Sequence, residues 1–277
     1  MITMLIYRAV GAFTFLAGTA VLIGWQLDIM LLKSINPNWV SMKPNTAVCF
    51  ILIGLAMLLR ISDEVEKRPR WKYWACTFLG GFVSILTALT LLQMIFAIDL
   101  GIDQLLYHES LFPPATAYAG RMAIDTGVFF IIAAAVTCYS NILNRRIEIV
   151  LFSFVLMSAG IGGCLTNMLY RGLDILPVIG IWQNTLMAAH TAFLFFMIFT
   201  AQILILWPKR DKFSSLNQRT SFVIIITMGV ISFSLYNQLY QDANHSVAFA
   251  KNIAKNNVEK DLNLKLNNVF TQFASSR

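Results

Sequence analysis

Charged residues are scarce in this sequence. Only 13% of its 277 residues are Asp, Glu, Lys or Arg, whereas 57% are hydrophobic, and the mean hydropathy is +0.67. A water-soluble domain of this length needs a larger polar surface than these residues supply. The composition therefore excludes the soluble class and indicates a polytopic membrane protein.

The sequence also lacks the motifs by which enzymes are recognised. It contains no glycine-rich phosphate loop, no G-x-S-x-G, no H-E-x-x-H, and no histidine-kinase or nucleotide-cyclase signature. Its cysteines follow no C-x-x-C spacing and all fall inside apolar runs, which is typical of packing residues: Cys49, Cys76, Cys138 and Cys164. No catalytic activity is therefore expected of this part of the protein.

Long apolar runs make up most of what remains. Seven runs are long enough to cross the ~30 Å hydrocarbon core of a bilayer as helices. They lie near residues 9–26, 43–60, 73–98, 122–142, 147–169, 185–207 and 220–237. We therefore predict an all-α fold with seven transmembrane helices.

One motif returns at the start of the second, fourth and sixth runs, at intervals of 65 to 80 residues. It reads Met, two variable residues, a polar residue, Thr and a small residue, with Phe eight places after the Met. Upstream of each copy lies a hydrophobic-Asp step, at Asp28, Asp103 and Asp174. Such an internal period predicts a repeated structural unit. We expect three helical hairpins, at 1–62, 70–143 and 146–208, which together form a six-helix membrane bundle.

Basic residues indicate the orientation of this bundle, because Lys and Arg collect in short cytoplasmic loops. Twelve of them, counting Arg8, lie on the side of the N-terminus, and four lie on the side of the three motifs. We predict a bacterial inner-membrane protein with a cytoplasmic N-terminus and the motifs at the outer face. The net charge of +7 then meets anionic lipid headgroups, so no nucleic-acid partner is expected.

The C-terminal part changes character. Residues 209–237 read as a cytoplasmic connector followed by the seventh membrane helix, which continues as a polar segment over 238–277. Apolar residues recur in this segment at three-and-four spacing, which predicts an amphipathic periplasmic helix of about 50 Å. Its narrow apolar stripe favours a homodimeric coiled coil or a following domain. We interpret it as the truncated start of an extracytoplasmic sensor domain.

The polar residues of the motif are the first candidates for a binding site. Asn45, Asp125 and His190 converge at the outer face if the hairpins surround a pseudo-threefold axis, and polar residues in membranes tend to face such interiors. A small amphiphile, such as a lipid, a quinone or a diffusible signal, is the expected ligand. The candidate ligand-binding residues are Asn45, Asp103, Asp125, Tyr170, Arg171, Trp182, His190 and Thr191. The alternative is structural: the threonines and their polar neighbours cap helices and bond across the bundle.

Histidines raise a second possibility for the same region. His190 and His108 are candidate ligands for a haem iron or a transition metal, because imidazoles from facing helices suit both. Their spacing does not signal ligation, so the cofactor stays open between haem, metal and none.

Three segments carry a resemblance to a known class of proteins. Gly24-Trp25-Gln26-Leu27-Asp28-Ile29, Met42-Lys43-Pro44-Asn45-Thr46-Ala47 and Asp99-Leu100-Gly101-Ile102-Asp103-Gln104-Leu105-Leu106 resemble the MASE-like N-terminal membrane region of bacterial multidomain sensors. The tail Phe270–Arg277 is similar to the helix that begins a CHASE-like periplasmic domain. The resemblance covers about residues 7–277, although Asp125 and His190 replace the Asn expected in the motif.

The resemblance implies a sensory input module of a signal-transduction receptor. In such proteins PAS domains and a two-component histidine kinase or a GGDEF diguanylate cyclase follow the membrane module, and the output type stays open here. A rival from another class is a membrane anchor and dimerisation scaffold whose missing periplasmic domain does the sensing. A small transporter suits the sequence less, because three repeats do not divide into two alternating halves.

Overall fold

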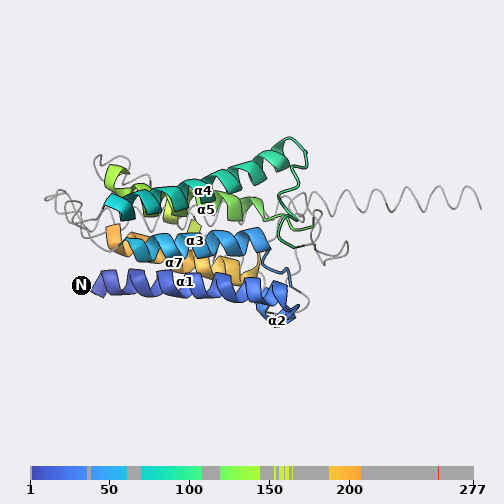
Figure 1. The fold of residues 1–277 in the computed structure, drawn as a ribbon, viewed down its shortest axis with the longest axis horizontal. Coiled ribbons are helices and arrows are strands. Elements are labelled where there is room, and N and C mark those ends of the chain that lie inside the picture. Colours follow the sequence, from blue (N-terminus) through green and yellow to red (C-terminus); the bar gives the residue numbers. More distant parts are fainter. Residues whose placement is uncertain are drawn as a thin grey trace, which may run out of the picture.

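The computed structural model describes residues 2–35, 39–60, 70–107, 119–143 and 187–206, together with 153, 156–158, 160, 161, 164 and 255. Every regular element in these ranges is helical: α1 (Ile2–Gln26), α2 (Met30–Lys33), α3 (Pro44–Leu59), α4 (Arg70–Ile95), α5 (Ile124–Leu143) and α7 (Ala189–Leu206). The five long helices lie side by side in one bundle, and the short α2 sits at the end where α1 finishes (Figure 1). The predicted all-α class is confirmed for these residues.

Three of the helices, α1, α4 and α7, are long and apolar enough to cross a membrane. The apolar helices α3 and α5 approach the length of a membrane span. The 16 residues of α3 rise about 24 Å, against a hydrocarbon core of about 30 Å. These helices fit the membrane-protein class that the composition predicts. Most of the predicted span 147–169, and the predicted connector, seventh span and periplasmic helix at 209–277 apart from Lys255, lie outside the described residues.

The predicted spans 43–60, 73–98, 122–142 and 185–207 agree with α3, α4, α5 and α7 to within four residues at every end. Helix α1 differs, because it begins seven residues before the predicted span 9–26. The difference arises at Arg8, whose side chain is exposed. A long cationic side chain within two turns of a helix end can keep its charge in water while its backbone stays helical.

The buried residues of α1 and α4 share one spacing. Six buried positions of α1 recur 69 residues later in α4: Tyr7, Gly11, Thr14, Gly18, Val21 and Gly24 correspond to Cys76, Gly80, Val83, Thr87, Thr90 and Gln93. The two helices also end alike, because Asp28 and Ala97 both have positive φ, at 56° and 50°. The N–H groups of Ile29 and Ile98 then donate to the carbonyls of Gly24 and Gln93.

A second correspondence links α3, α5 and α7, which all begin two residues after the Met of the motif. In each copy the residue after the Thr donates its N–H to the residue after the Met, over 3.0 to 3.1 Å. Equivalent side chains of the motif are buried in all three copies: Met42, Met122 and Met187, then Thr46, Thr126 and Thr191.

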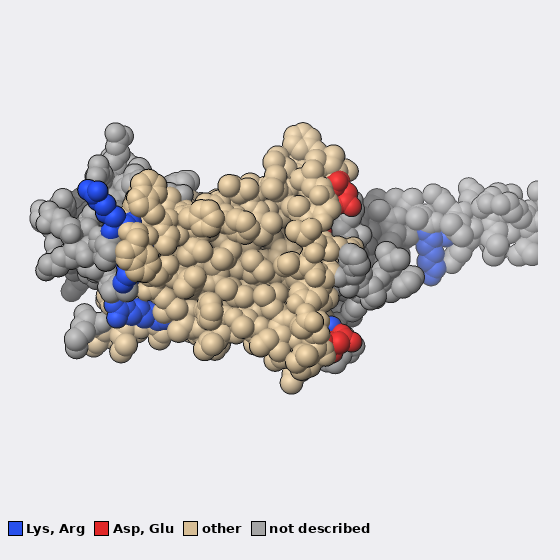
Figure 2. All heavy atoms as spheres, in the orientation of Figure 1, with Lys and Arg blue, Asp and Glu red and all other residues tan. Residues whose placement is uncertain are grey.

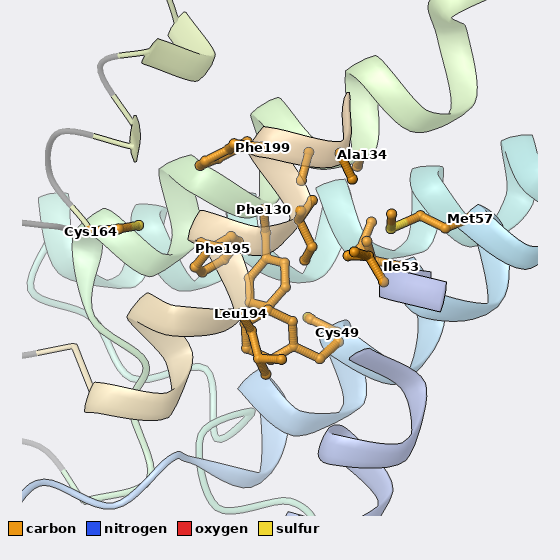
Figure 3. Packing of buried hydrophobic residues seen from close by; sticks show 14 of the residues in the cluster. Cys49, Ile53, Met57, Phe130, Ala134, Cys164, Leu194, Phe195 and Phe199 are labelled. Atoms are coloured by element: carbon orange, nitrogen blue, oxygen red, sulfur yellow. The ribbon is translucent and has the colours of Figure 1, made fainter. Parts of the chain in front are cut away.

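The three motif phenylalanines form the centre of the core. Phe50, Phe130 and Phe195 are wholly buried. Their ring centroids lie 4.7 Å apart for Phe50 and Phe130, 5.0 Å for Phe50 and Phe195, and 4.7 Å for Phe130 and Phe195. Figure 3 shows Phe130 and Phe195 facing each other between their helices. Three rings at such similar separations hold α3, α5 and α7 together at one level.

The outer helices pack against this central trio. Helix α1 lies mainly on α3 and also on α7, whereas α4 lies on α5 and α3. Small residues permit the close approach: a Cβ atom on Gly54 would lie 2.7 Å from the Gly11 carbonyl oxygen, and one on Gly18 would lie 2.7 Å from that of Ala47. Such contacts are how helices associate where lipid supplies no hydrophobic drive.

Apart from Lys255, the described charges divide between the two ends of the bundle (Figure 2). One end, which we call the basic end, carries Arg8, Arg60, Arg70 and Lys72 and no described acidic residue. The opposite end, which we call the motif end, carries Lys33, Lys43 and Arg121 together with Asp28, Asp99, Asp103 and Asp125.

Candidate functional site

The first turns of α3, α5 and α7 hold four of the predicted ligand-binding residues at the motif end. Asn45 is 5% exposed and Thr191 is 1% exposed, whereas Asp125 and His190 are half-buried. The phenylalanine contacts one turn deeper keep these three first turns at one level. The predicted site residues Tyr170, Arg171 and Trp182, and the predicted metal ligand His108, lie outside the described residues.

Buried polar atoms of Asn45 and Thr191 in these first turns have no hydrogen-bond partner. They are the Nδ2 amide nitrogen of Asn45 and the Oγ1 hydroxyl of Thr191. Asn45 does not cap its helix, since no side chain caps α3, where Pro44 occupies the first turn. A buried donor without a partner costs about 1–3 kcal/mol, so such groups normally accompany a bound molecule or water.

Asp125 serves its own helix instead. Its Oδ1 atom accepts a hydrogen bond from the Thr126 N–H at 2.8 Å. A carboxylate in the first turn also interacts favourably with the helix dipole. This hydrogen bond agrees with the structural alternative for Asp125, while ligand binding by this residue stays a prediction.

Asp103 belongs to a buried network that ties the loop after α4 to the start of α5. Its Oδ2 atom accepts from Arg121 Nε at 2.6 Å and from Gln93 Nε2 at 3.0 Å, and the Leu100 N–H donates to Gln93 Oε1 at 2.7 Å. The side chains of Asp103 and Arg121 are only 6% and 5% exposed. Gly120 is required beside them, because it has φ +75° and a Cβ atom there would collide with the Asp103 carbonyl.

A different ion pair closes the loop between α1 and α3. Lys33 Nζ donates to the Asp28 carboxylate and lies 4.8 Å from the centre of the Trp25 ring. The Trp25 Nε1–H donates to the Met42 carbonyl at 2.9 Å, and the Met42 N–H donates to the Lys33 carbonyl at 2.9 Å. The hydrogen bond and charge of Lys33 lower the pKa of Asp28. Asp28 is an exposed turn residue, so it is not the structural equivalent of buried Asp103.

The described residues contain no group of three His, Cys, Asp or Glu side chains placed to hold a metal ion. His190 is described and lies in the first turn of α7, but its predicted partner His108 is not. The predicted haem or metal site is therefore not tested by the geometry.

A second polar cluster, which the sequence analysis missed, lies toward the basic end. It joins Tyr7 of α1, Arg60 after α3, Thr137 of α5 and Gln202 of α7, all buried. Gln202 Nε2 donates to Thr137 Oγ1 at 2.8 Å and to the Ala133 carbonyl at 2.9 Å. The signal that could have found it is the presence of Arg60 and Gln202 inside apolar runs, where polar residues are costly.

Comparison with protein-family models, with curated proteins and with solved structures finds no match to this chain. Its function is therefore argued from the residues at the two ends of the bundle.

Proposed function

We propose that this chain is the membrane-embedded sensory input module of a bacterial signal-transduction receptor. It binds a small amphiphilic ligand at the motif end, beside the first turns of α3 and α7, and passes a conformational change to attached domains. The observation that carries the proposal is the pair of buried polar atoms without partners, Asn45 Nδ2 and Thr191 Oγ1.

The chemistry of these atoms defines the ligand class. An amide N–H₂ group donates, and a hydroxyl both donates and accepts, so the ligand offers a carbonyl, carboxyl or hydroxyl oxygen. The surroundings are apolar, since Met42 and Met187 are buried in the same hydrophobic cluster. A quinone, a fatty acid or a lipid with an oxygen-bearing head combines these two properties.

The closed centre of the bundle supports a sensor over a small transporter or channel. The wholly buried rings of Phe50, Phe130 and Phe195 fill the space between α3, α5 and α7. A ligand at the motif end then acts through its different affinity for two packings of the helices. Signalling through a homodimer, with the predicted periplasmic helix as the link, completes this proposal.

The rival scaffold function has its own support in the outer loops. Asp103 and Asp125 both bond within the protein, as a purely structural bundle requires. A scaffold, however, gives no account of the Asn45 amide and the Thr191 hydroxyl. We therefore keep the scaffold as the second candidate.

The test compares ligand retention in matched variants. Gently purified wild-type protein is examined by mass spectrometry and visible absorption for a retained quinone, lipid or haem. We expect Asn45→Leu and Thr191→Val to lose the retained molecule and its thermal stabilisation. The control is Thr200→Val on α7, the helix that also carries Thr191. The Thr200 hydroxyl already has a partner, since it donates to the Phe196 carbonyl at 2.7 Å.

The stability of the ligand-free variants distinguishes a loss of ligand binding from a loss of folding. Replacing an unpaired buried hydroxyl by a methyl group removes a desolvated polar atom, so Thr191→Val should leave the stability of ligand-free protein unchanged or raised. Full retention of the molecule in both Asn45→Leu and Thr191→Val would overturn the ligand site and favour the scaffold.

The proposed orientation has a separate test. Asp99→Cys at the motif end and Arg70→Cys at the basic end are both exposed positions, and each is placed in a background without other cysteines. A membrane-impermeant thiol reagent added to spheroplasts should label only the Asp99→Cys protein. Labelling of the Arg70→Cys protein alone would show that the basic end, and not the motif end, lies at the outer face.

A further inference from the structure

We propose a second binding site at the basic end, in which Arg60 holds a phosphate oxyanion among α1, α3, α5 and α7. The site is distinct from the motif end and does not rest on the proposed sensory function. It is built from three buried side chains with unpaired polar atoms: Tyr7, Arg60 and Gln202.

The Arg60 guanidinium is buried and incompletely bonded. Its residue is 3% exposed, and the guanidinium lies 5.5 Å from the centre of the Tyr7 ring. Nη1 reaches the Val136 carbonyl at 3.5 Å, the limit of a hydrogen bond, and Nη2 has no partner. The Nη2 group of the planar guanidinium therefore has no acceptor.

A buried cation of this kind requires an anion. Arginine stays protonated in proteins, and an uncompensated charge in an apolar interior is strongly unfavourable. The described acidic residues Asp28, Asp99, Asp103 and Asp125 all lie at the motif end, so none of them is available. The argument for a bound anion therefore rests on the buried Nη2 donor of Arg60, which has no partner.

The neighbours of Arg60 complete a polar site. Gln202 donates both bonds of its Nε2 group to Thr137 Oγ1 and the Ala133 carbonyl, which fixes Oε1 as an acceptor without a partner. The buried Tyr7 hydroxyl lies near Arg60 and Thr137 but makes no hydrogen bond of normal geometry. The site therefore offers two donors and one acceptor.

This combination fits a phosphate that carries a hydroxyl group. The Arg60 and Tyr7 donors match phosphate oxygens, since the guanidinium fork pairs with phosphate in a planar, bidentate manner. Gln202 Oε1 then accepts from the P–OH of inorganic phosphate or from the glycerol hydroxyl of a phosphatidylglycerol headgroup. Arg8 and Lys72 at the same end add a positive field that attracts either source.

The experiment measures stabilisation of the whole chain in nanodiscs. One arm compares zwitterionic lipid with and without phosphatidylglycerol, and the other titrates inorganic phosphate in zwitterionic lipid at constant ionic strength. We expect one of the two probes to raise the unfolding temperature of the wild-type protein. The arm that responds identifies the source of the phosphate.

The variants assign the effect to Arg60. Arg60→Lys keeps the charge but loses the fork, and we expect it to weaken the apparent Kd about tenfold. Tyr7→Phe should weaken binding less, while Arg70→Gln, an exposed basic residue at the same end, should bind as the wild type does. Circular dichroism and gel filtration establish that each variant is folded before its binding is compared.

Two results would overturn the proposal. A wild-type protein that responds to neither probe would mean that the counter-charge comes from elsewhere in the chain. An equal response in the wild type, Arg60→Lys and Tyr7→Phe would mean that lipid or phosphate acts at the surface. Neither result bears on the retained ligand at the motif end, so the two proposals fail independently.

Discussion

At the scale of single residues, polar side chains in this apolar chain divide into those that bond within the protein and those that have no partner. The Oδ2 atom of Asp103 accepts hydrogen bonds from Arg121 and Gln93 beside the loop after α4, and only its Oδ1 atom has no partner. Asn45, by contrast, keeps a buried donor unused. Since an unpaired buried group is costly, the unpaired residues are the ones that point to a ligand.

The pair of exposed Asp28 and buried Lys33 makes a prediction about pH. Lys33 lowers the pKa of Asp28, so the folded loop favours the carboxylate. The resulting stabilisation is present above the pKa of Asp28 in the unfolded chain and is lost as pH falls through the folded value. Carboxyl-carbon NMR should show Asp28 titrating below the ordinary Asp range, and Lys33→Met should return its pKa upward. An unchanged pKa in Lys33→Met would contradict this assignment.

The buried pair of Asp103 and Arg121 makes a prediction about stability. Asp103→Ala or Arg121→Ala alone should lower the free energy of unfolding by about 3–5 kcal/mol, because each leaves a buried partner unpaired. The double replacement Asp103→Leu with Arg121→Met should cost much less than the two single changes together. Reversible denaturation in mild detergent measures all three proteins. Strict additivity would argue against direct coupling.

At the scale of the helices, packing depends on where glycine meets a neighbouring backbone. Gly54 of α3 faces α1 so closely that an added Cβ atom would lie 2.6 Å from the Phe15 nitrogen. Gly81 of α4 has no atom within 4 Å of the same position. The same residue type therefore has a packing role in one helix and none in the other.

We predict opposite outcomes for alanine at these two glycines. Gly54→Ala must separate α1 from α3 and should destabilise the bundle by about 1–3 kcal/mol. Gly81→Ala places its methyl group in open space and should be neutral or slightly stabilising, because alanine favours the helix. Thermal unfolding of both proteins in one detergent checks the pair. Equal effects would show that helix propensity, rather than the α1–α3 contact, governs the change.

At the scale of the whole molecule, the three motif copies meet in one aromatic centre. Phe50, Phe130 and Phe195 come from three helices far apart in the sequence, yet each ring contacts the other two. The buried positions of the outer helices α1 and α4 also match one another, as the predicted repeat requires.

Truncation of the aromatic centre should therefore have similar effects from all three helices. Phe50→Ala, Phe130→Ala and Phe195→Ala should each lower the stability by about 3 kcal/mol, since each leaves a cavity of the same kind. Phe78→Ala is the matched control, because that ring is 73% exposed on the outside of α4. Chemical denaturation compares the four proteins. An effect confined to one of the three would argue against an equivalent arrangement.

The sequence alone determined the membrane class, the helical fold and most helix ends in the described part of the chain. Hydrocarbon thickness and backbone bonding leave an apolar run of this length few alternatives to a helix. The motif spacing likewise identified the phenylalanines and the polar first turns that the structure brings to one level.

Only the tertiary structure decided which polar residues have partners. Asp28 and Asp103 look alike in the sequence, but one is exposed in a turn and the other is buried against Arg121. The cluster of Tyr7, Arg60, Thr137 and Gln202 comes from four helices and follows no local spacing. Hydrogen bonding and desolvation depend on neighbours brought together by folding, and a periodic pattern along one chain does not contain that information.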